Sequence, residues 1–224
     1  MKLYDWWKAK NSLKHVLWIG GSACSGKSTI STRLAEGFGF IRYHGDDHIG
    51  EHIDTAAEED SPFLYKIHEQ GIMNYLGWVL TQKAEKIVQV IYDIYREDLR
   101  LVSEDLLTMP ADKPIVVDLF AGHPTWELRQ LADPEKAIFL VSTNPFIKEG
   151  QRKRFQKGGI LSQALEQCPT SVEVFMKGYV ESVHMRSADV REECEKYNLS
   201  LLITGGNMSV DEVYSAVCMH FGLS

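Results

Sequence analysis

The sequence contains no hydrophobic run long enough to cross a bilayer, because a membrane-spanning helix needs about 20 consecutive apolar residues. It also lacks the pattern of an export signal. The stretch Met1–Lys14 holds four lysines and the pair Trp6-Trp7, without an apolar segment followed by a small-residue cleavage site. We therefore expect a cytoplasmic protein that has no membrane among its partners.

Cysteines are few, and their spacing is not that of a metal site or a disulfide framework. No C-x-x-C pair occurs among the four, which are Cys24, Cys168, Cys194 and Cys218. In a reducing compartment we expect all of them to remain free thiols.

Positive charge is also scarce, with 24 Lys and Arg against 31 Asp and Glu and a formal net charge of −7. Proteins that bind nucleic acid neutralise its phosphates with surplus Lys and Arg, so nucleic acid is not expected as the main partner, although a local basic patch stays open. The hydrophobic content of 44% with 25% charged residues is typical of a globular protein with a buried core.

The length of 224 residues is compatible with one α/β domain that carries insertions. No internal repeat, low-complexity tract or Pro/Gly-rich linker divides the chain. Within a single domain over 1–224 we predict a core over 15–122, which carries substrate-side helices at about 55–108. The fourth strand and a lid follow over 137–170, and the last strand and helix lie over 199–224.

Short apolar segments, often rich in β-branched residues, predict buried parallel strands. There are five: His15–Gly20, Gly39–Tyr43, Pro114–Phe120, Ala137–Ser142 and Leu199–Thr204. Helical patterns lie between them, over Lys27–Phe38, Ser61–Leu80, Gln82–Leu107, Ser171–Tyr197 and Ser209–Phe221. The last of these follows a capping box, Ser209-x-x-Glu212. Alternating strands and helices predict a doubly wound five-stranded parallel sheet with helical lid and substrate-side insertions, and ligands at the carboxyl ends of the strands.

The residues Gly21–Ser28 read G-S-A-C-S-G-K-S directly after the first strand, which is the pattern of a phosphate-binding P-loop. In such a loop the backbone N–H groups point at phosphate oxygens, Lys27 reaches the β- and γ-phosphates, and the Ser28 hydroxyl ligates Mg²⁺. The helix behind it presents its positive end to the same anion. The predicted nucleotide-binding residues are Gly21, Ser22, Ala23, Cys24, Ser25, Gly26, Lys27, Ser28 and Thr29. The alternative is a Gly/Ser turn without a ligand, and we expect Cys24 to fill space in the loop rather than react.

Two carboxylates follow the second strand, which should lie beside the phosphate loop. A carboxylate in this place can take the proton from an acceptor hydroxyl during phosphoryl transfer. We predict Asp46 as that base and Asp47 as a cap of the next helix, and the reverse assignment stays open. The histidines at 44, 48 and 52 are spaced by four, which suggests zinc. However, we expect Gly45 and Gly50 to interrupt any helix that would align them, which favours surface or substrate-facing histidines.

The third strand and the two last loops add further candidates. Asp118 ends the run I-V-V-D and is predicted either to hold Mg²⁺ through water or to be a buried, hydrogen-bonded aspartate. A basic segment after the fourth strand contains Arg152 and Arg154 and suits a mobile lid over the transferring phosphate, the alternative being a solvated basic loop. Arg186 and Arg191 could supply a second contact. Gly205 and Gly206, after the fifth strand, could border the adenine or form a plain turn.

Together these residues resemble the P-loop kinase family, the group that includes nucleoside-monophosphate, shikimate and gluconate kinases. The motifs that carry the resemblance are Gly21–Thr29, the Asp46-Asp47 pair, the basic lid and the Thr204–Asn207 loop. The chain is most similar to a poorly characterised bacterial kinase-like subgroup. That subgroup shares the DD pair, E-D-L-L-x-x-P at Glu104–Pro110 and V-x-T-x-x-F at Val141–Phe146. The resemblance implies ATP and Mg²⁺ as cofactors, with Lys27, Asp46, Arg152 and Arg154 as catalytic residues and Ser28 and Asp118 near the metal.

One absence separates this chain from the nucleotide kinases of that family, which grip the acceptor phosphate with arginines after the second strand. Between Arg42 and Arg96 there is no arginine, and the stretch is acidic. We therefore predict an ATP- and Mg²⁺-dependent phosphotransferase that acts on a small-molecule hydroxyl, neutral or cationic rather than a nucleotide. The acceptor pocket could be lined by His48, Tyr65, Trp78, Tyr92, Tyr95 and Arg96, or these aromatics could be core. A nucleotide or nucleoside kinase, and an ATP-binding regulatory module without catalysis, are the alternatives.

Overall fold

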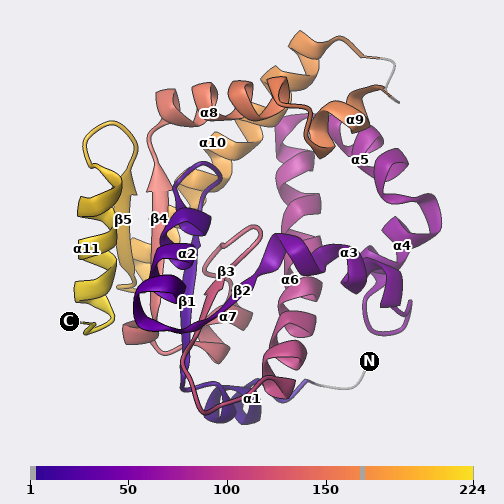
Figure 1. The fold of residues 1–224 in the computed structure, drawn as a ribbon. Coiled ribbons are helices and arrows are strands. Elements are labelled where there is room, and N and C mark those ends of the chain that lie inside the picture. The colour runs from indigo at the N-terminus through magenta and orange to yellow at the C-terminus, as the bar shows by residue number, and fades with distance from the viewer. Residues whose placement is uncertain (1–3, 167–169, 224) are drawn as a thin grey trace.

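The computed structural model describes residues 4–166 and 170–223, so the prediction of a free thiol at Cys168 lies outside the described residues. A five-stranded sheet runs through the molecule, and all its strand pairs are parallel (Figure 1). Its strands are β1 (Val16–Gly21), β2 (Ile41–His44), β3 (Ile115–Asp118), β4 (Ala137–Ser142) and β5 (Ser200–Thr204), in the spatial order β2-β3-β1-β4-β5. The predicted α/β class and five parallel strands are confirmed, and each predicted strand is found with its bounds shifted by at most a few residues.

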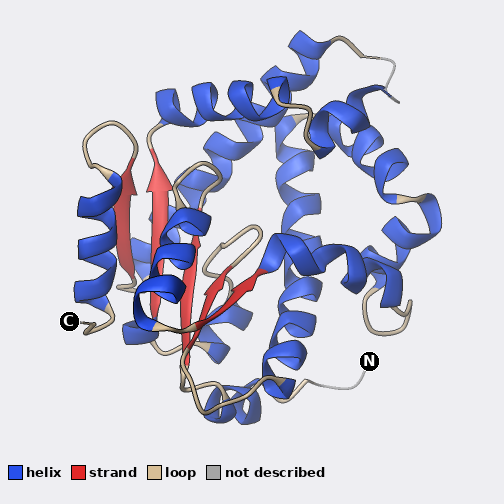
Figure 2. Ribbon diagram, viewed as in Figure 1, coloured by secondary structure: helices blue, strands red, loops and turns tan. Residues whose placement is uncertain are grey.

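Helices lie on both faces of the sheet (Figure 2). They are α1 (Trp6–Ser12), α2 (Lys27–Phe38), α3 (Gly45–Thr55), α4 (Pro62–Gln70), α5 (Ile72–Leu80), α6 (Ala84–Thr108), α7 (Trp126–Leu131), α8 (Asn144–Gln156), α9 (Ile160–Glu166), α10 (Val172–Lys196) and α11 (Val210–His220), with a 3₁₀ turn η1 (Pro134–Lys136). In the described part of the chain, no helix is both long and apolar enough to cross a bilayer.

Alternate residues of each strand serve two separate cores, because successive side chains of a strand point to opposite faces of the sheet. Trp18 and Val117 pack with α1, α6, α7 and α10 on one face. Ile19 and Val116 pack with α2 and α11 on the other. A third core, away from the sheet, joins α3, α4 and α5 to α6. β1, β3 and β4 are buried along their whole length, which explains why they read as continuous apolar runs, whereas the edge strands β2 and β5 are partly exposed. The arrangement is compatible with the predicted doubly wound sheet.

The predicted helices over Lys27–Phe38, Gln82–Leu107, Ser171–Tyr197 and Ser209–Phe221 match α2, α6, α10 and α11 within two residues, and the capping box at Ser209 is formed. Ser61–Leu80 was predicted as one helix and is two. Gly71 separates them with a φ of 77°, a conformation in which a helix cannot continue and which glycine adopts without a side-chain clash.

The expectation that Gly45 and Gly50 interrupt a helix is wrong, since both lie within α3. A glycine in a helix costs about 1 kcal/mol. The helix forms because Ile53 is buried in the third core and His52 is held by α6, as described below. The basic segment after β4 is also ordered as a helix, α8, with Pro145 in its first turn and Ile147 buried. The helices α1, α7 and α9 were not predicted.

Candidate functional site

The carboxyl ends of all five strands meet at one edge of the sheet, and the residues Gly21–Ser28 form a loop there between β1 and α2 (Figure 1). The base of this loop is fixed by backbone contacts. Gly21 N–H donates to the Gly122 carbonyl at 2.6 Å, and Ser22 N–H donates to the Leu140 carbonyl at 2.9 Å. A Cβ on Gly21 would overlap the Leu140 backbone, so only glycine allows β4 to approach this closely.

The top of the loop presents backbone donors. The first helical residue of α2 is Lys27, and Gly26 precedes it with a φ of 93°. Among the described residues, the N–H groups of residues 26–29 have no protein acceptor, as is usual for the first turn of a helix. Together with the positive end of the helix dipole, these donors form a site for an anion. These N–H groups lie where the sequence predicts a phosphate loop, after β1 and at the start of α2.

The Lys27 side chain folds back over this loop. Its ammonium donates to the carbonyls of Gly21 and Ser22, at 3.2 and 2.9 Å. Burial lowers the pKa of Lys27 to about 8, an effect that the carboxylates of Asp46 and Asp118 oppose and the guanidinium groups of Arg154 and Arg186 reinforce. Lys27 is therefore within electrostatic reach of charges of both signs: the guanidinium groups of Arg154 and Arg186, and the carboxylates of Asp46 and Asp118.

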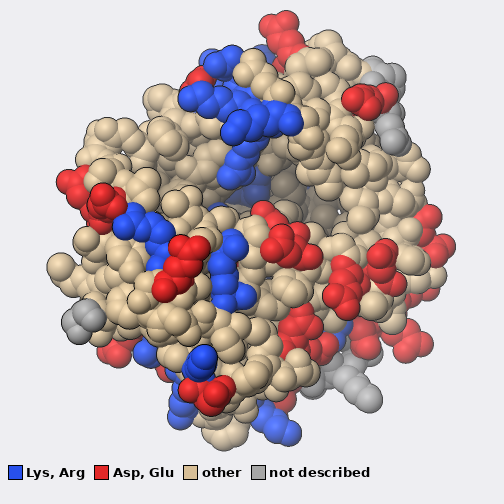
Figure 3. All heavy atoms as spheres, in the orientation of Figure 1, with Lys and Arg blue, Asp and Glu red and all other residues tan. Residues whose placement is uncertain are grey.

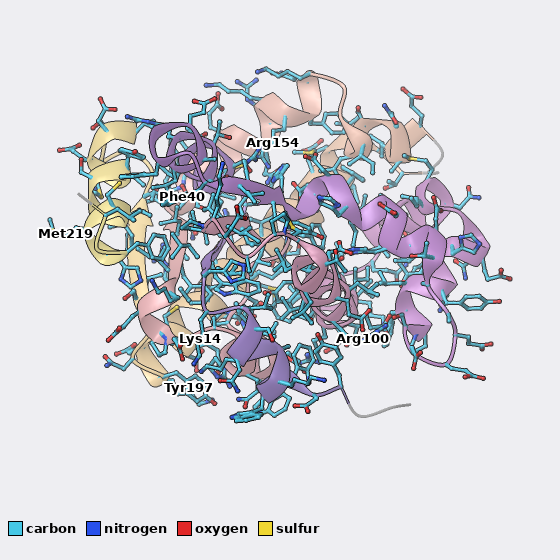
Figure 4. All side chains as sticks on the ribbon, turned by 60° about the horizontal axis from the view of Figure 1, so that its bottom comes forward. Lys14, Phe40, Arg100, Arg154, Tyr197 and Met219 are labelled. Atoms are coloured by element: carbon cyan, nitrogen blue, oxygen red, sulfur yellow. The ribbon has the colours of Figure 1, made fainter. Side chains whose placement is uncertain are left out.

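The helix α8 lies directly over the loop. At Gly150 an added Cβ would come 2.8 Å from the Cys24 sulfur, so the helix backbone touches the loop with no side chain between them. Arg154, labelled in Figure 4, comes from the next turn of α8, and its charge reaches both Cys24 and Lys27. Arg152 instead makes a two-pronged ion pair with Glu149 of its own helix, at 3.0 Å, and is exposed. Of the two predicted lid arginines, the structure brings only Arg154 to the loop.

The predicted acid pair lies across a hollow from these cations. Figure 3 shows that hollow beneath basic side chains of α8 and above acidic side chains at the start of α3. Asp46 and Asp47 both lie in the first turn of α3, and both are exposed. The residue in the cap position is His44, so Asp47 is not the predicted cap. The charge of Asp46 has the largest effect of those that act on the pKa of Lys27.

Asp118 ends β3, which lies between β2 and β1, and is buried, with 1% exposure. One carboxylate oxygen accepts from the Ser31 hydroxyl and from the Arg42 guanidinium, the latter at 3.1 Å; the other is bonded to Nδ1 of His44. Both oxygens therefore have protein partners, as in the second of the two predicted roles, the buried and hydrogen-bonded aspartate. Ser28, one turn before Ser31, is exposed beside the free N–H groups of the loop.

Sequence reasoning missed Arg42 as a partner of Asp118. The signal was available: a charged residue within the short apolar segment Gly39–Tyr43 needs a partner, because buried charges are paired. The register supplies it, since β2 aligns His44 with Asp118 and Arg42 with Val116 on the neighbouring strand β3. The carboxyl edge of these two strands is thus joined by charge as well as by backbone hydrogen bonds.

The three histidines each have a different partner, and the described residues include no group of three or more metal-ligating side chains. His44 bonds Asp118, and His48 stacks on Tyr43 with ring centroids 4.1 Å apart. His52 is buried between two aspartates of α6, with Nδ1 2.6 Å from Asp98 and Nε2 3.0 Å from Asp105. These last two bonds attach α3, and with it the acid pair, to α6.

We predict that this attachment makes stability depend on pH. Burial by itself lowers the pKa of His52, but the hydrogen bonds to Asp98 and Asp105 outweigh it and raise the pKa. The stabilisation is therefore fully present below the unfolded-state pKa of about 6.5 and is lost as pH rises through the folded-state value. His52→Gln should lower the free energy of unfolding by about 3 kcal/mol at pH 6 and by less at pH 9, measured by urea denaturation.

The matched control for this prediction is His68→Gln. The side chain of His68 is 44% exposed, and its Nδ1 lies 3.6 Å from an Asp54 carboxylate oxygen. This substitution should change the free energy of unfolding by less than about 0.5 kcal/mol at either pH. A deficit in His52→Gln that stays constant between pH 6 and pH 9 would show that His52 does not stabilise the fold as a cation.

The loop after β5 adjoins the phosphate loop, since the Thr204 hydroxyl donates to the Ser25 carbonyl at 3.0 Å. Gly205 packs closely against the end of β4 and the start of α8, since a Cβ there would lie 2.5 Å from Ser142 Oγ and 3.0 Å from Phe146. Gly206 faces open space. Of this pair, only Gly206 has open space beside its Cα; an adenine contact of either glycine stays a prediction.

The aromatic residues proposed for an acceptor pocket do not gather in one place. Tyr95 is fully buried in the core beside the sheet, whereas Trp78 is 43% exposed, with Lys66 over its ring. Tyr92 and Arg96 line a cavity of their own between α6 and α10. The Arg191 guanidinium donates to the Ser142 carbonyl at 3.2 Å, whereas the charge of Arg186 helps to lower the pKa of Lys27.

No protein-family model matches this chain, and no curated protein matches its sequence. Among solved structures, the chain is similar to the crystal structure of TT1252 from Thermus thermophilus, with a TM-score of 0.47 and 16% sequence identity. The similarity covers 91% of this chain and 96% of that one. A likeness this distant carries no functional argument, so the site must be interpreted from the residues of this chain.

Proposed function

We propose that this protein is a P-loop phosphotransferase that uses ATP and Mg²⁺ to phosphorylate a hydroxyl group of a small molecule. The observation that carries the proposal is the convergence at one loop of free backbone N–H groups, the Lys27 ammonium and the charges of Arg154 and Arg186. Four N–H groups without an acceptor at the start of a helix, together with the positive charges of Lys27, Arg154 and Arg186, suit the high negative charge of a triphosphate.

Each residue then has a distinct part in the transfer. Lys27 and Arg154 stabilise the charge that develops on the transferring phosphoryl group. The Ser28 hydroxyl would hold Mg²⁺, which supplies further charge neutralisation when it is bound. The Asp46 carboxylate lies in the first turn of α3, its charge reaches Lys27, and it takes the proton from the acceptor hydroxyl. Asp118 acts through others: it fixes α2 through Ser31 and the end of β2 through His44.

The acceptor side of the hollow favours a neutral or positively charged substrate. It begins with the acid pair on α3, and no arginine occurs between Arg42 and Arg96 to grip an acceptor phosphate. Nucleoside monophosphates are thereby disfavoured relative to polyols, sugars and amino alcohols.

A substrate screen tests this proposal. The purified protein with ATP and Mg²⁺ is offered polyols, sugars, amino alcohols, nucleosides and nucleoside monophosphates, and ADP release and product mass are measured. We expect at least one uncharged or cationic alcohol to stimulate ADP release and gain the mass of a phosphoryl group. Calorimetry with a non-hydrolysable ATP analogue is run in parallel. Analogue binding without any stimulated turnover would favour the regulatory module, and no binding would refute the nucleotide site itself.

A further inference from the structure

A second cavity lies away from the phosphate loop, between α6, α10 and the segment from His123 into α7. Its volume is about 510 Å³, within the range of small-molecule sites. Its walls include Tyr92 and Arg96 of α6, His123 before α7, Glu127 of α7, and Asp189 of α10. The lining includes no residue of the phosphate loop, α3 or α8, so this cavity is separate from the hollow described above.

The cavity wall contains polar groups whose hydrogen bonds are not made within the described protein. His123 is only 9% exposed, and neither of its ring nitrogens has a partner among the described residues. The buried Oε2 of Glu127 is likewise unpartnered. The buried Tyr95 hydroxyl is a third polar group without a hydrogen-bond partner among the described residues, and the charge of Glu127 helps to raise its pKa. Because buried polar groups are normally satisfied, such a concentration in one place indicates a bound partner.

The charge balance of the cavity indicates the sign of that partner. Its two arginines are already compensated. Arg129 bonds Glu193 and the Pro124 carbonyl and stacks on Tyr197, while Arg96 pairs with Asp93. The carboxylates of Glu127 and Glu192 have no basic partner in the described chain, and Asp189 receives only the neutral Tyr92 hydroxyl. The uncompensated charge is therefore negative.

The polar groups of the cavity that lack hydrogen-bond partners further restrict the chemical class of the ligand. Burial lowers the pKa of His123 to about 4, so its ring is neutral at pH 7 and offers one N–H donor and one acceptor nitrogen. The Glu127 oxygen is an acceptor. The ligand must therefore bring at least two N–H or O–H donors and one acceptor. The Tyr92 ring, and the Trp126 indole, which is 55% exposed, supply the aromatic faces that an ammonium group prefers.

We propose that the cavity between α6, α7 and α10 is a binding site for a small organic amine, in which Glu127 receives the ammonium group and His123 a neighbouring hydroxyl or amine. The assignment is independent of the phosphotransferase proposal, because it rests on other residues and can be measured without ATP.

Calorimetry on the protein of residues 1–224 tests the site with ethanolamine and 3-aminopropan-1-ol as probes, each of which carries an ammonium group and a hydroxyl. Glycerol and butyrate, of similar size, serve as the neutral and anionic comparisons. We expect an amine to bind at least tenfold more tightly than either comparison, an estimate based on one charge-assisted hydrogen bond. Intrinsic fluorescence should change on amine addition in the wild type and lose that change in Trp126→Phe. Equal binding of glycerol and the amines, or no binding of either amine, would overturn the proposal.

Substitutions in the cavity test whether the amine binds there rather than elsewhere on this acidic protein. Glu127→Gln keeps the side-chain shape and removes the charge, and it should weaken amine binding by about tenfold. Glu195→Gln, an exposed glutamate of α10 outside the cavity, is the matched control and should bind as the wild type does. Thermal melting shows whether Glu127→Gln is folded. If it is not, His123→Asn gives an independent second test. Amine affinity that is unchanged in both cavity variants, or reduced equally in Glu195→Gln, would refute the site.

Discussion

Replacing Lys27 with methionine should reduce substrate-stimulated ADP release by about a thousandfold, the effect of losing one group that stabilises transition-state charge in a preorganised site. Methionine keeps the length and much of the packing of the lysine and removes only its charge and its hydrogen bonds to the Gly21 and Ser22 carbonyls. The measurement is steady-state turnover with the alcohol identified in the screen. ATP-analogue affinity, measured by calorimetry, should fall as well, because the lysine also contacts the ground-state phosphates.

Lys153→Met is the matched control for this experiment. Lys153 lies on α8 near the same hollow, but its side chain is 64% exposed and pairs with Glu149 at 3.5 Å. It should retain turnover within a factor of about three, since exposed ion pairs contribute little. If Lys27→Met turned over as fast as Lys153→Met, the loop would not be the site of phosphoryl transfer.

Asp46→Asn should lower turnover by between about a hundredfold and ten-thousandfold, because an amide cannot accept the proton of the acceptor hydroxyl. The ATP-analogue affinity should be little changed, since the role proposed for Asp46 is toward the acceptor rather than the nucleotide. The side chain is 60% exposed, so the substitution should also leave the melting temperature nearly unchanged. A loss in turnover with binding and folding intact would identify a role in the chemical step.

Asp47→Asn provides the comparison, since the two aspartates share a helical turn and an exposed environment. It should lose much less turnover than Asp46→Asn. The opposite result would assign the base to Asp47, an alternative that the sequence leaves open. Full activity in both variants would mean that the reaction needs no carboxylate here and that the acceptor hydroxyl is activated otherwise.

The sequence was most informative where function and local structure depend on the same residues. The loop at Gly21–Ser28 could be predicted because its glycines, lysine and helix start are all local requirements of phosphate binding. The sheet was equally clear, since strands buried on both faces leave long apolar runs. The capping box at Ser209 could be predicted for the same reason, because its two partners are three residues apart.

Predictions failed where a distant partner decides the local structure. The α3 helix forms despite two glycines because His52 meets Asp98 and Asp105, which lie 46 and 53 residues further along the chain. The order of the basic segment depends on Ile147, whose burial no local pattern reveals. Arg152 and Arg154 are chemically alike in the sequence, and only the helical geometry of α8 sends one to Glu149 and the other toward Lys27. Tertiary contacts override local preference in each case.

The close approach of Gly150 to the Cys24 sulfur has a consequence for the evolution of this chain. The two positions share a fixed space, 126 residues apart in sequence, and an added Cβ on the helix side would come 2.8 Å from the sulfur. A larger residue at 150 is therefore tolerable only when position 24 shrinks to glycine, because the Cβ of Cys24 itself would lie 3.1 Å from the added Cβ. When homologous sequences are aligned, these two columns should covary in size, and the pair should stay glycine with cysteine wherever α8 closes over the loop as it does here.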